Sequence, residues 1–366
     1  MRFVLNIGMH KTGSSSIQGT FADYDVGSKR YLSVGHPNLS GLLSTLFLTT
    51  PENHQTHRRN MRGPRDVAQL RDQFHGKVDA FLDGTPSDAT VFASAEDLCL
   101  FDHEEVERLA RWTQTRFDDV TIVGYARPPH SFMSSAMQQR IAGGVPWSAR
   151  QLFPRYRDRF QPYDDVFGRG RVELVKFAPD ALVDADVVID FADRVGLERG
   201  SYAISRANEG RRAGTIAALL SHRVHVGQPS RYPGSPRDNS TLVDLLRALG
   251  GERLEIAPEV AAAVASSRLA DLDWISERVG DPDFNDIPTV SETPPKPGTL
   301  RIADKEDLLA RAAAELPAVL RLAADYAVRE QDPKLTAMAV DLLLQMIRSN
   351  HGRSGGTPAS TPKRPV

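Results

Sequence analysis

The chain has 366 residues, which is enough for one large domain or two smaller ones at roughly 150 residues per domain. Hydrophobic residues make up 40% and charged residues 25%, so the composition is that of a folding chain and not of a disordered one. Lysine and arginine number 45 against 47 aspartates and glutamates, and the net charge of −2 removes any general attraction to nucleic acid. An anion site must therefore be local.

The cysteine content and the N-terminal segment bear on the compartment. The single cysteine, Cys99, excludes an internal disulfide framework and zinc sites built on several thiolates, which fits a reducing environment. The apolar stretch Phe3-Val4-Leu5 ends at Asn6, far short of a signal-peptide core or of the ~20 residues that span a bilayer. We therefore expect a cytoplasmic protein with no transmembrane segment and no nucleic-acid partner.

The expected elements begin with an apolar strand over residues 2–7, a loop, and an amphipathic helix over residues 17–24. Further short runs are rich in β-branched and aromatic residues and predict buried strands, with helical spacing between them. This alternation predicts an α/β fold, a P-loop-like parallel sheet with helices on both faces. The later strands are expected over 90–93, 120–125 and 172–177, and the helices over 104–116, 131–141 and 182–195.

The pattern changes after Gly196, where no convincing strand is visible and helices are expected over 216–224, 242–249, 258–269 and 303–346. The pattern predicts an α/β core over residues 1–210 and a helical extension packed on it over 211–280. A proline-rich linker then follows over 281–298, with C-terminal helices over 299–353 and a disordered tail over 354–366.

The segment between the first strand and the first helix carries the most specific chemistry, and it reads Ile7-Gly8-Met9-His10-Lys11-Thr12-Gly13-Ser14-Ser15-Ser16. Such a turn directs backbone N–H groups and the positive end of the helix dipole at one point, which suits an anion. In nucleotide-triphosphate loops a lysine follows the second glycine directly, and a serine or threonine then binds magnesium. Here Ser14 follows Gly13 and the lysine is Lys11, an arrangement that suits group transfer without a metal.

This segment resembles the donor loop of sulfotransferases that use 3′-phosphoadenosine 5′-phosphosulfate, particularly bacterial members in which HKTG is followed by serine or threonine. The resemblance implies that the loop binds the 5′-phosphosulfate of this co-substrate and that no metal is required. It implies a catalytic role for Lys11, at the bridging oxygen of the leaving phosphate. It also implies donor-binding roles for Lys11, Thr12, Gly13, Ser14, Ser15 and Ser16.

A second stretch supports the resemblance. Arg127 follows the strand expected over 120–125, and Ser135 comes eight residues later in the expected helix. The pair is similar to the motif with which the family holds the 3′-phosphate, and a planar guanidinium is suited to phosphate oxygens. The family's second arginine is absent, because His130 and Ser131 occupy its place. The resemblance covers roughly residues 1–210, which makes this region the expected nucleotide-binding core.

An alcohol acceptor also needs a general base, and two catalytic candidates remain open. His36 titrates near neutrality without help from its surroundings, which favours it. Glu96 follows the second expected strand, and ligand sites in open α/β sheets gather at the carboxyl ends of strands. Lesser candidates are Asp23, Asp25, His10 and His54.

The acceptor is expected to be a hydroxyl compound, either a glycan or a small molecule. The span from residue 39 to residue 65 is rich in basic side chains, which suits an acidic acceptor. One alternative is an ATP-dependent kinase with a degenerate loop, for which Glu96 or Asp97 would have to bind magnesium. Another is a catalytically inactive nucleotide-binding module. The basic residues of the span are His54, His57, Arg58, Arg59, Arg62 and Arg65.

Overall fold

The computed structural model describes residues 1–206, 212–227, 235–289, 299–302, 337–338, 340–341 and 344. The chain forms two compact units. The first comprises Met1–Ala136, Ala149–Glu209 and Pro258–Thr293, and the second comprises Met137–Ser148, Gly210–Ala257 and Pro294–Val366. The expected disordered tail lies outside the described residues, as does nearly all of the helix expected over 303–346.

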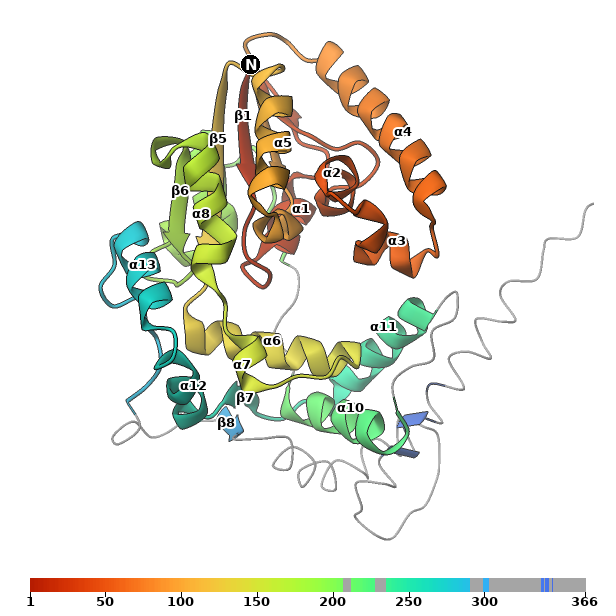
Figure 1. Cartoon of the computed structure of the whole chain (residues 1–366), viewed down its shortest axis with the longest axis vertical. Helices are drawn as coiled ribbons and strands as arrows, with labels where there is room; N and C mark the ends of the chain where they lie inside the picture. Colours follow the sequence, from red (N-terminus) through yellow and green to blue (C-terminus); the bar gives the residue numbers. More distant parts are fainter. Residues whose placement is uncertain are drawn as a thin grey trace, which may run out of the picture. The chain divides into compact units, whose positions relative to one another are not determined.

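The first unit is built on a six-stranded sheet with the order β2-β3-β4-β1-β5-β6 (Figure 1). The central strand β1 is parallel to both of its neighbours, and every pairing is parallel except that of β2 with β3. This topology confirms the α/β class and the parallel sheet. The strands are β1 (Arg2–Asn6), β2 (Asp25–Val26), β3 (Lys29–Tyr31), β4 (Thr90–Ser94), β5 (Asp119–Ala126) and β6 (Val172–Lys176).

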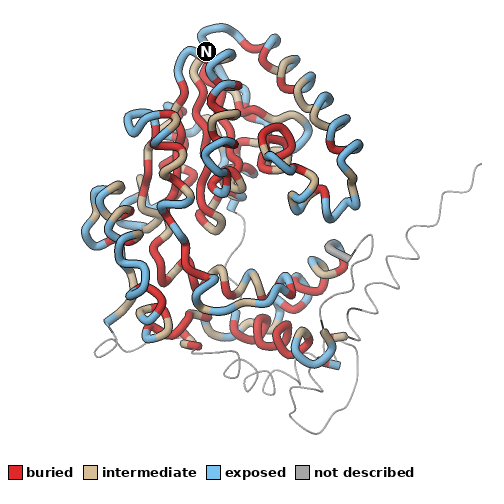
Figure 2. Tube along the Cα trace, in the orientation of Figure 1, coloured by how far each residue is buried: buried red, intermediate tan, exposed pale blue. Residues whose placement is uncertain are grey.

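Apolar side chains cover both faces of this sheet, and the strands are mostly buried along their length (Figure 2). Val4 and Tyr125 pack with Phe21 and Phe191 from the helices on one face. On the other face Phe3 stacks on Phe117, with 4.6 Å between ring centroids. A strand that is buried on both faces has a continuous apolar sequence, and for this reason the central strands could be predicted from the sequence.

One strand position brings a helix unusually close to the sheet. A Cβ atom on Gly124 of β5 would lie 2.7 Å from Leu174 Cδ2 and 2.8 Å from a ring carbon of Phe160. Glycine therefore allows the helix that carries Phe160 to pack directly on β5 and β6. This close packing fixes the far end of β5, where Arg127 follows.

Helices lie on both faces of the sheet, with α1 and α9 on the face of Val4 and α5 and α8 on the opposite face. Figure 1 shows α5 and α8 in front of the strands. The α-helices of this unit are α1 (Ser14–Phe21), α2 (Ser40–Phe47), α3 (Gln55–Arg59), α4 (Pro64–Asp83), α5 (His103–Gln114), α6 (Pro129–Gly143, up to Ala136), α7 (Ala149–Leu152), α8 (Tyr156–Phe167), α9 (Val187–Val195), α12 (Pro258–Ala265) and α13 (Leu269–Val279). Its 3-10 helices are η1 (Pro51–Asn53), η2 (Glu96–Leu100), η3 (Arg169–Arg171) and η4 (Val183–Ala185).

The second unit contains helices and a small parallel sheet. The expectation of no strand after Gly196 is wrong, because β7 (Arg253–Ile256) pairs with β8 (Thr299–Ile302). Each of these strands has four residues, and a run that short gives little alternation to recognise. The helices are α10 (Ala213–His225), α11 (Ser235–Leu246) and η5 (Arg247–Leu249).

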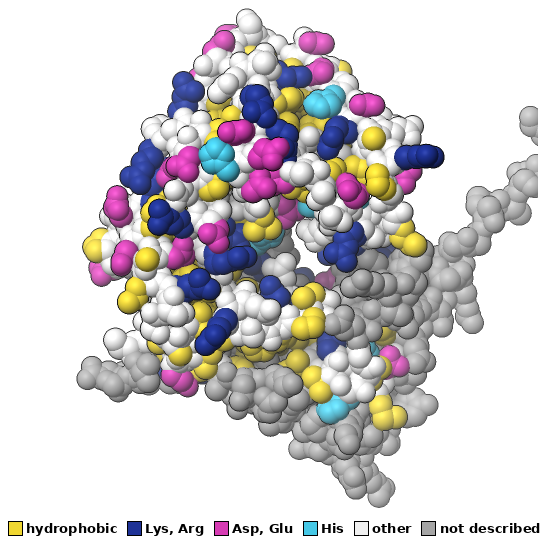
Figure 3. Space-filling view, in the orientation of Figure 1, with side chains coloured by type: hydrophobic (Ala, Val, Ile, Leu, Met, Phe, Trp, Pro, Cys, Tyr) yellow, Lys and Arg dark blue, Asp and Glu magenta, His cyan; other side chains and the backbone are white. Residues whose placement is uncertain are grey.

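No helix among the described residues is both long enough and apolar enough to cross a membrane. Lysine, arginine, aspartate and glutamate side chains are interspersed over the surface visible in Figure 3. The segment expected as a linker is described only over residues 281–289, where it forms neither helix nor strand.

Candidate active site

The loop between β1 and α1 adopts a tight turn with three residues at positive φ. Gly8 has φ 35°, Lys11 has φ 70°, and Gly13, the residue preceding α1, has φ 80°. A Cβ atom on Gly13 would lie 2.5 Å from Val187 Cγ1, so both the backbone angle and the available space require glycine there. A lysine costs roughly 1 to 3 kcal/mol in such a conformation, and strained residues of this kind gather at ligand sites.

Buried hydrogen bonds hold the loop from within. The side-chain oxygen of Asn6 accepts from the Gly8 N–H at 2.9 Å, and its Nδ2 donates to Ser94 Oγ at 3.0 Å. Thr12 Oγ1 donates to the Met9 carbonyl at 2.6 Å. The Thr12 hydroxyl proton therefore serves the loop itself, so a ligand could receive only the backbone N–H of this residue.

The three serines after Gly13 differ in their surroundings. Ser14 is buried, and its hydroxyl has no hydrogen-bond partner in the described structure, whereas Ser15 is exposed. The Ser16 N–H donates to the Gly13 carbonyl at 2.9 Å, which tightens the first turn. A buried hydroxyl without a partner is costly unless a ligand oxygen completes it, so Ser14 is the serine best suited to a bound anion.

Arg127 follows β5 and reaches across to the loop after β1. Its Nη1 donates to the Lys11 carbonyl oxygen at 2.8 Å, and its guanidinium lies over the Phe177 ring at 5.8 Å. The contact follows from the topology, because β1 and β5 are parallel neighbours and their carboxyl ends meet at one edge of the sheet. The structure thus brings Arg127 to the backbone of Lys11, so the two residues that the sequence singled out lie at the same edge of the sheet.

The start of α6 contains a contact of Arg127 that the sequence analysis did not anticipate. Arg127 Nε donates to Ser131 Oγ at 3.3 Å, and Ser135, expected with Arg127 to hold a 3′-phosphate, is partly buried one helical turn further on. The first N–H groups of α6, those of His130 and Ser131, both donate to the Asp286 carboxylate, at 2.6 and 3.0 Å. Any phosphate held here would depend on side chains, because Asp286 already occupies the helix N-terminus. The spacing of Ser131, four residues after Arg127, was the available signal for this contact.

The two base candidates occupy different surroundings. Glu96, at the start of η2, accepts from Gln18 Nε2 at 2.7 Å and from Asn38 Nδ2 at 3.4 Å, and it is partly buried. Since Gln18 belongs to α1, these bonds connect Glu96 to the helix that the donor loop begins. His36 is exposed, and its Nδ1 accepts from the Asn38 N–H at 3.1 Å.

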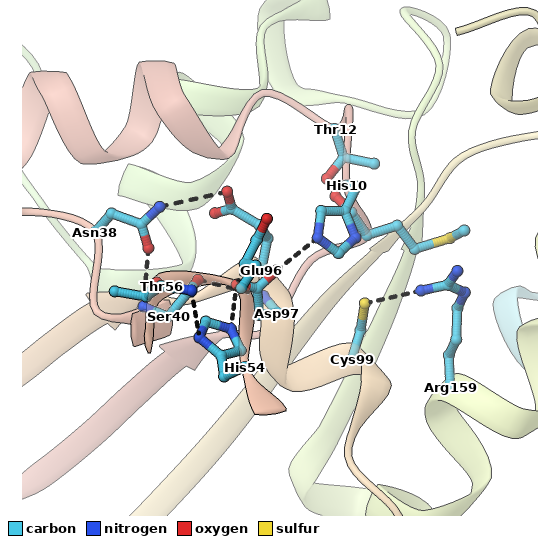
Figure 4. A network of polar contacts seen from close by, with 12 residues as sticks. His10, Thr12, Asn38, Ser40, His54, Thr56, Glu96, Asp97, Cys99 and Arg159 are labelled. Carbon is cyan, nitrogen blue, oxygen red and sulfur yellow. Dashed lines mark hydrogen bonds and ion pairs between the residues drawn. The ribbon is translucent and has the colours of Figure 1, made fainter. Parts of the chain in front are cut away.

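The lesser candidates for the general base also differ in their surroundings. Asp25 pairs with Arg30 at 3.0 Å on the β2–β3 hairpin, and Asp23 is exposed. His10 and His54 instead meet at a single carboxylate, that of Asp97 (Figure 4).

Asp97 is the centre of a cluster that sequence reasoning did not assemble. His10 Nε2 lies 2.6 Å from Asp97 Oδ1, and His54 Nε2 lies 3.1 Å from Asp97 Oδ2. Burial alone would lower the pKa of His10, but the Asp97 carboxylate and Cys99 together raise it to about 10. Burial would raise the pKa of Asp97, yet the two histidines hold it well below its usual range.

The same contacts bear on the kinase alternative. Both oxygens of Asp97 contact histidines, and both oxygens of Glu96 accept from side-chain amides. Within the described ranges, no group of three or more histidine, cysteine, aspartate or glutamate side chains is arranged to hold a metal ion.

The basic span is only partly a surface patch. His57 is buried, and its Nε2 lies 2.7 Å from Thr45 Oγ1, while His54 is turned towards Asp97. The arginines are different, because none of the four forms an ion pair with a carboxylate of the described chain. We call them the arginine patch, and they are Arg58, Arg59 and Arg65, all exposed, and Arg62, which is partly exposed.

No protein-family model and no curated protein matches the chain. Among solved structures, the chain is similar to a sulfotransferase from Alicyclobacillus acidocaldarius, with 16% sequence identity and a TM-score of 0.35. The similarity covers 60% of this chain and 90% of that one. At this identity and TM-score the similarity assigns no activity to this chain.

Proposed function

We propose that the protein is a sulfotransferase that moves the sulfuryl group of 3′-phosphoadenosine 5′-phosphosulfate to a hydroxyl acceptor. One observation carries the proposal, the 2.8 Å contact between Arg127 Nη1 and the Lys11 carbonyl oxygen. A donor with anionic groups on both the 5′ and 3′ positions of one ribose requires two cations within the length of one nucleotide. The adjacent ends of β1 and β5 place the backbone of Lys11 against Arg127, so these two residues are our candidates for that pair.

The buried end of α1 supports the same proposal. The Ser14 hydroxyl has no partner, and the first N–H groups of any helix lack intrahelical acceptors. Together with the helix dipole, these donors favour an anion at the turn that Gly13 makes. The 5′-phosphosulfate would therefore be held by backbone N–H groups, by Ser14 and by the Lys11 ammonium group.

The reaction we propose is a direct displacement at sulfur. The acceptor oxygen attacks the sulfur atom while the bond from sulfur to the 5′-phosphate oxygen breaks, and the phosphate leaves with the electron pair. Lys11 would stabilise the negative charge that develops on the leaving oxygen. The acceptor gives its proton to a base as the new bond forms.

For that base we propose Glu96 in preference to His36. Glu96 follows β4, the strand next to β1, and it is tied to α1 through Gln18. The amides of Gln18 and Asn38 fix the orientation of the carboxylate, and each oxygen retains a further lone pair for the acceptor proton. His36 lies on an exposed loop with one ring nitrogen already occupied by a backbone N–H.

For the acceptor we propose an acidic hydroxyl compound such as a carboxylated glycan. The arginine patch supplies four guanidinium groups that no carboxylate of the described chain neutralises. It follows His54, which contacts the cluster beside the donor loop. Guanidinium groups bind carboxylate and sulfate groups through paired hydrogen bonds, which suits a substrate carrying several such groups.

Calorimetry with 3′,5′-adenosine diphosphate tests the proposal first, because this product keeps both phosphates of the donor. We expect binding that Lys11→Ala and Arg127→Ala weaken, while Lys77→Ala, an exposed lysine on α4, leaves it unchanged. A sulfation assay over a panel of neutral and acidic acceptors then tests transfer. Absence of nucleotide binding would contradict the proposal, binding without transfer would favour the inactive module, and magnesium-dependent use of ATP would favour the kinase.

A further inference from the structure

The Asp97 cluster joins three segments that are distant in the sequence. His10 lies within the donor loop, Asp97 lies on η2 after β4, and His54 is the N-cap residue of α3. Figure 4 shows the His10 and His54 rings on two sides of the Asp97 carboxylate. The Asp97 N–H donates to Ser40 Oγ at 3.3 Å, which fixes its backbone as well.

The hydrogen bonds of His54 assign its protons. Its Nδ1 accepts from the Thr56 N–H at 3.4 Å, so that nitrogen carries a lone pair. The proton of a neutral imidazole then sits on Nε2, which donates to Asp97 Oδ2. The contact of His54 with Asp97 is the longer of the two histidine contacts of this carboxylate.

The shorter contact of Asp97 is the one with His10. The Asp97 side chain is 12% exposed, and a carboxylate so withdrawn from water needs a cationic partner. The bond to His10 measures 2.6 Å, shorter than the bond to His54 and of the length that charge assistance gives. The imidazolium of this cluster therefore belongs to His10.

The groups that face His10 from the other packed elements agree with this assignment. The sulfur of Cys99, on η2, is its second partner, and Arg159 Nη1 on α8 lies 3.1 Å from that sulfur. Within the loop, Lys11 is the adjacent residue. The cations and potential anions therefore alternate from Arg159 to Cys99, His10 and Asp97.

We infer that Asp97 is a positioning residue that holds His10 as a fixed imidazolium in the donor loop and ties that loop to α3. The effect of this charge on nucleotide binding rests on the proposed function. As an imidazolium whose Nε2 is bonded to Asp97, His10 acts on a bound phosphate through its charge and has no lone pair with which to act as the general base. Because the imidazolium and the carboxylate compensate each other, the charge of the loop stays constant across neutral pH.

The first test measures the charge of His10 directly. In histidine ring NMR, with His10→Gln used to assign the signal, we expect no titration of His10 between pH 6 and 9 in the unaltered chain. Asp97→Asn keeps the shape of the side chain but removes its charge. The pKa of His10 should then fall below the ordinary value near 6.5, because burial lowers it. Titration of His10 near 6.5 in the unaltered chain would overturn the inference.

The second test measures whether that charge reaches the nucleotide. The affinity for 3′,5′-adenosine diphosphate is measured from pH 5.5 to 8 for Asp97→Asn and for the unaltered chain. The affinity of the variant is then divided by that of the unaltered chain at each pH. Titration of the nucleotide phosphates affects both affinities equally and drops out of this ratio. We expect this affinity ratio to be about five- to tenfold higher at pH 5.5 than at pH 8. At the lower pH, His10 of the variant carries a positive charge that no carboxylate compensates. The double variant with His10→Gln should show a flat ratio.

The outcomes separate the inference from the proposed function. A flat ratio for Asp97→Asn, in a protein whose His10 titrates by NMR, would overturn the role of His10 at the donor loop. If neither protein binds the nucleotide at any pH, the proposed function fails, and the NMR result alone decides the assignment of the imidazolium. If Asp97→Asn does not fold, His10→Gln takes its place in the test. This variant removes the imidazolium and should change the affinity for 3′,5′-adenosine diphosphate. An unchanged affinity at all pH values would contradict the inference.

Discussion

The loop from Gly8 to Ser14 and the helix α3 present positive charge in two different ways. In the loop, residues at positive φ and buried hydrogen bonds hold one tight turn that contains a single lysine. On α3 and the residues after it, the arginine patch is exposed to solvent and spread over a surface. Charge concentrated at one point suits the reacting group of a donor, whereas distributed charge suits the recognition of an extended acidic acceptor.

The largest effect that separates the two regions should come from the loop lysine. We expect Lys11→Ala to lower turnover by ~10² to 10³, the usual result of losing one preorganised donor to a developing anion. Sulfated product formed per minute at saturating acceptor measures this. Lys77→Ala is the matched control, and equal turnover in the two variants would remove Lys11 from catalysis.

The base assignment gives the next effect. Because a positioned base contributes ~10² to 10⁴, Glu96→Gln should lower turnover at least ~10²-fold. The change keeps the size of the side chain and one accepting oxygen, so one of the two hydrogen bonds from Gln18 and Asn38 remains. His36→Ala should leave turnover within about twofold, since the ring lies on an exposed loop. The opposite ranking of the two variants in the same assay would transfer the role to His36.

The backbone of the loop is expected to contribute next. Gly13→Ala introduces a clash with Val187 as well as an unfavourable φ, whereas Gly27→Ala, with φ 59° and open space around it, introduces only the second. We expect Gly13→Ala to lower the free energy of unfolding by about 1 to 3 kcal/mol more than Gly27→Ala. Urea denaturation of both variants measures the difference, and equal losses would mean that the loop has room to move.

The Asp97 cluster predicts a pH dependence of stability. The raised pKa of His10 means that its pairing stabilises the folded state fully below the unfolded value near 6.5, and the contribution is lost as pH rises towards about 10. At pH 6.5 Asp97→Asn should lower the free energy of unfolding by on the order of 1.5 to 3 kcal/mol, and this loss should shrink towards pH 10. Urea denaturation at several pH values tests the trend, and a loss that grows with pH would contradict it.

The smallest effect is expected from the exposed region. The double change Arg58→Ala and Arg59→Ala should raise KM for an acidic acceptor a few-fold at low salt, with less effect at high salt, because exposed charges are screened. Turnover at saturation and nucleotide affinity should stay unchanged, and Arg150→Ala on α7 serves as the control. An equal rise in KM for a neutral acceptor would show that the patch does not select by charge.

Sequence reasoning predicted the parts of the molecule whose conformation is determined by residues adjacent in the sequence. The strands β1, β4, β5 and β6 were visible because each is a short apolar run, and the loop from Gly8 to Ser14 because its residues are contiguous. The short strands β2, β3, β7 and β8 were not visible, since two to four residues carry no periodicity. Helices α4 and α8 were also missed.

The contacts within the site could not be predicted from the sequence, because they join residues that are distant in the chain. Asp97 meets His10 and His54, and Arg127 meets Ser131 and Lys11, through pairings that only the order of the strands brings together. The sequence could nominate His10, His54 and Arg127 as chemically capable residues. It could not indicate that one carboxylate would engage both histidines, nor that Asp286 would reach the start of α6.

The burial of Cys99 has a practical consequence for observing this protein at work. Its sulfur is completely enclosed, with Arg159 against it, and the chain has no other cysteine. A fluorophore or spin label attached through maleimide chemistry would therefore report on whichever surface position is changed to cysteine, with the native thiol left in place. Labels on α3 could follow the arrival of an acceptor in real time.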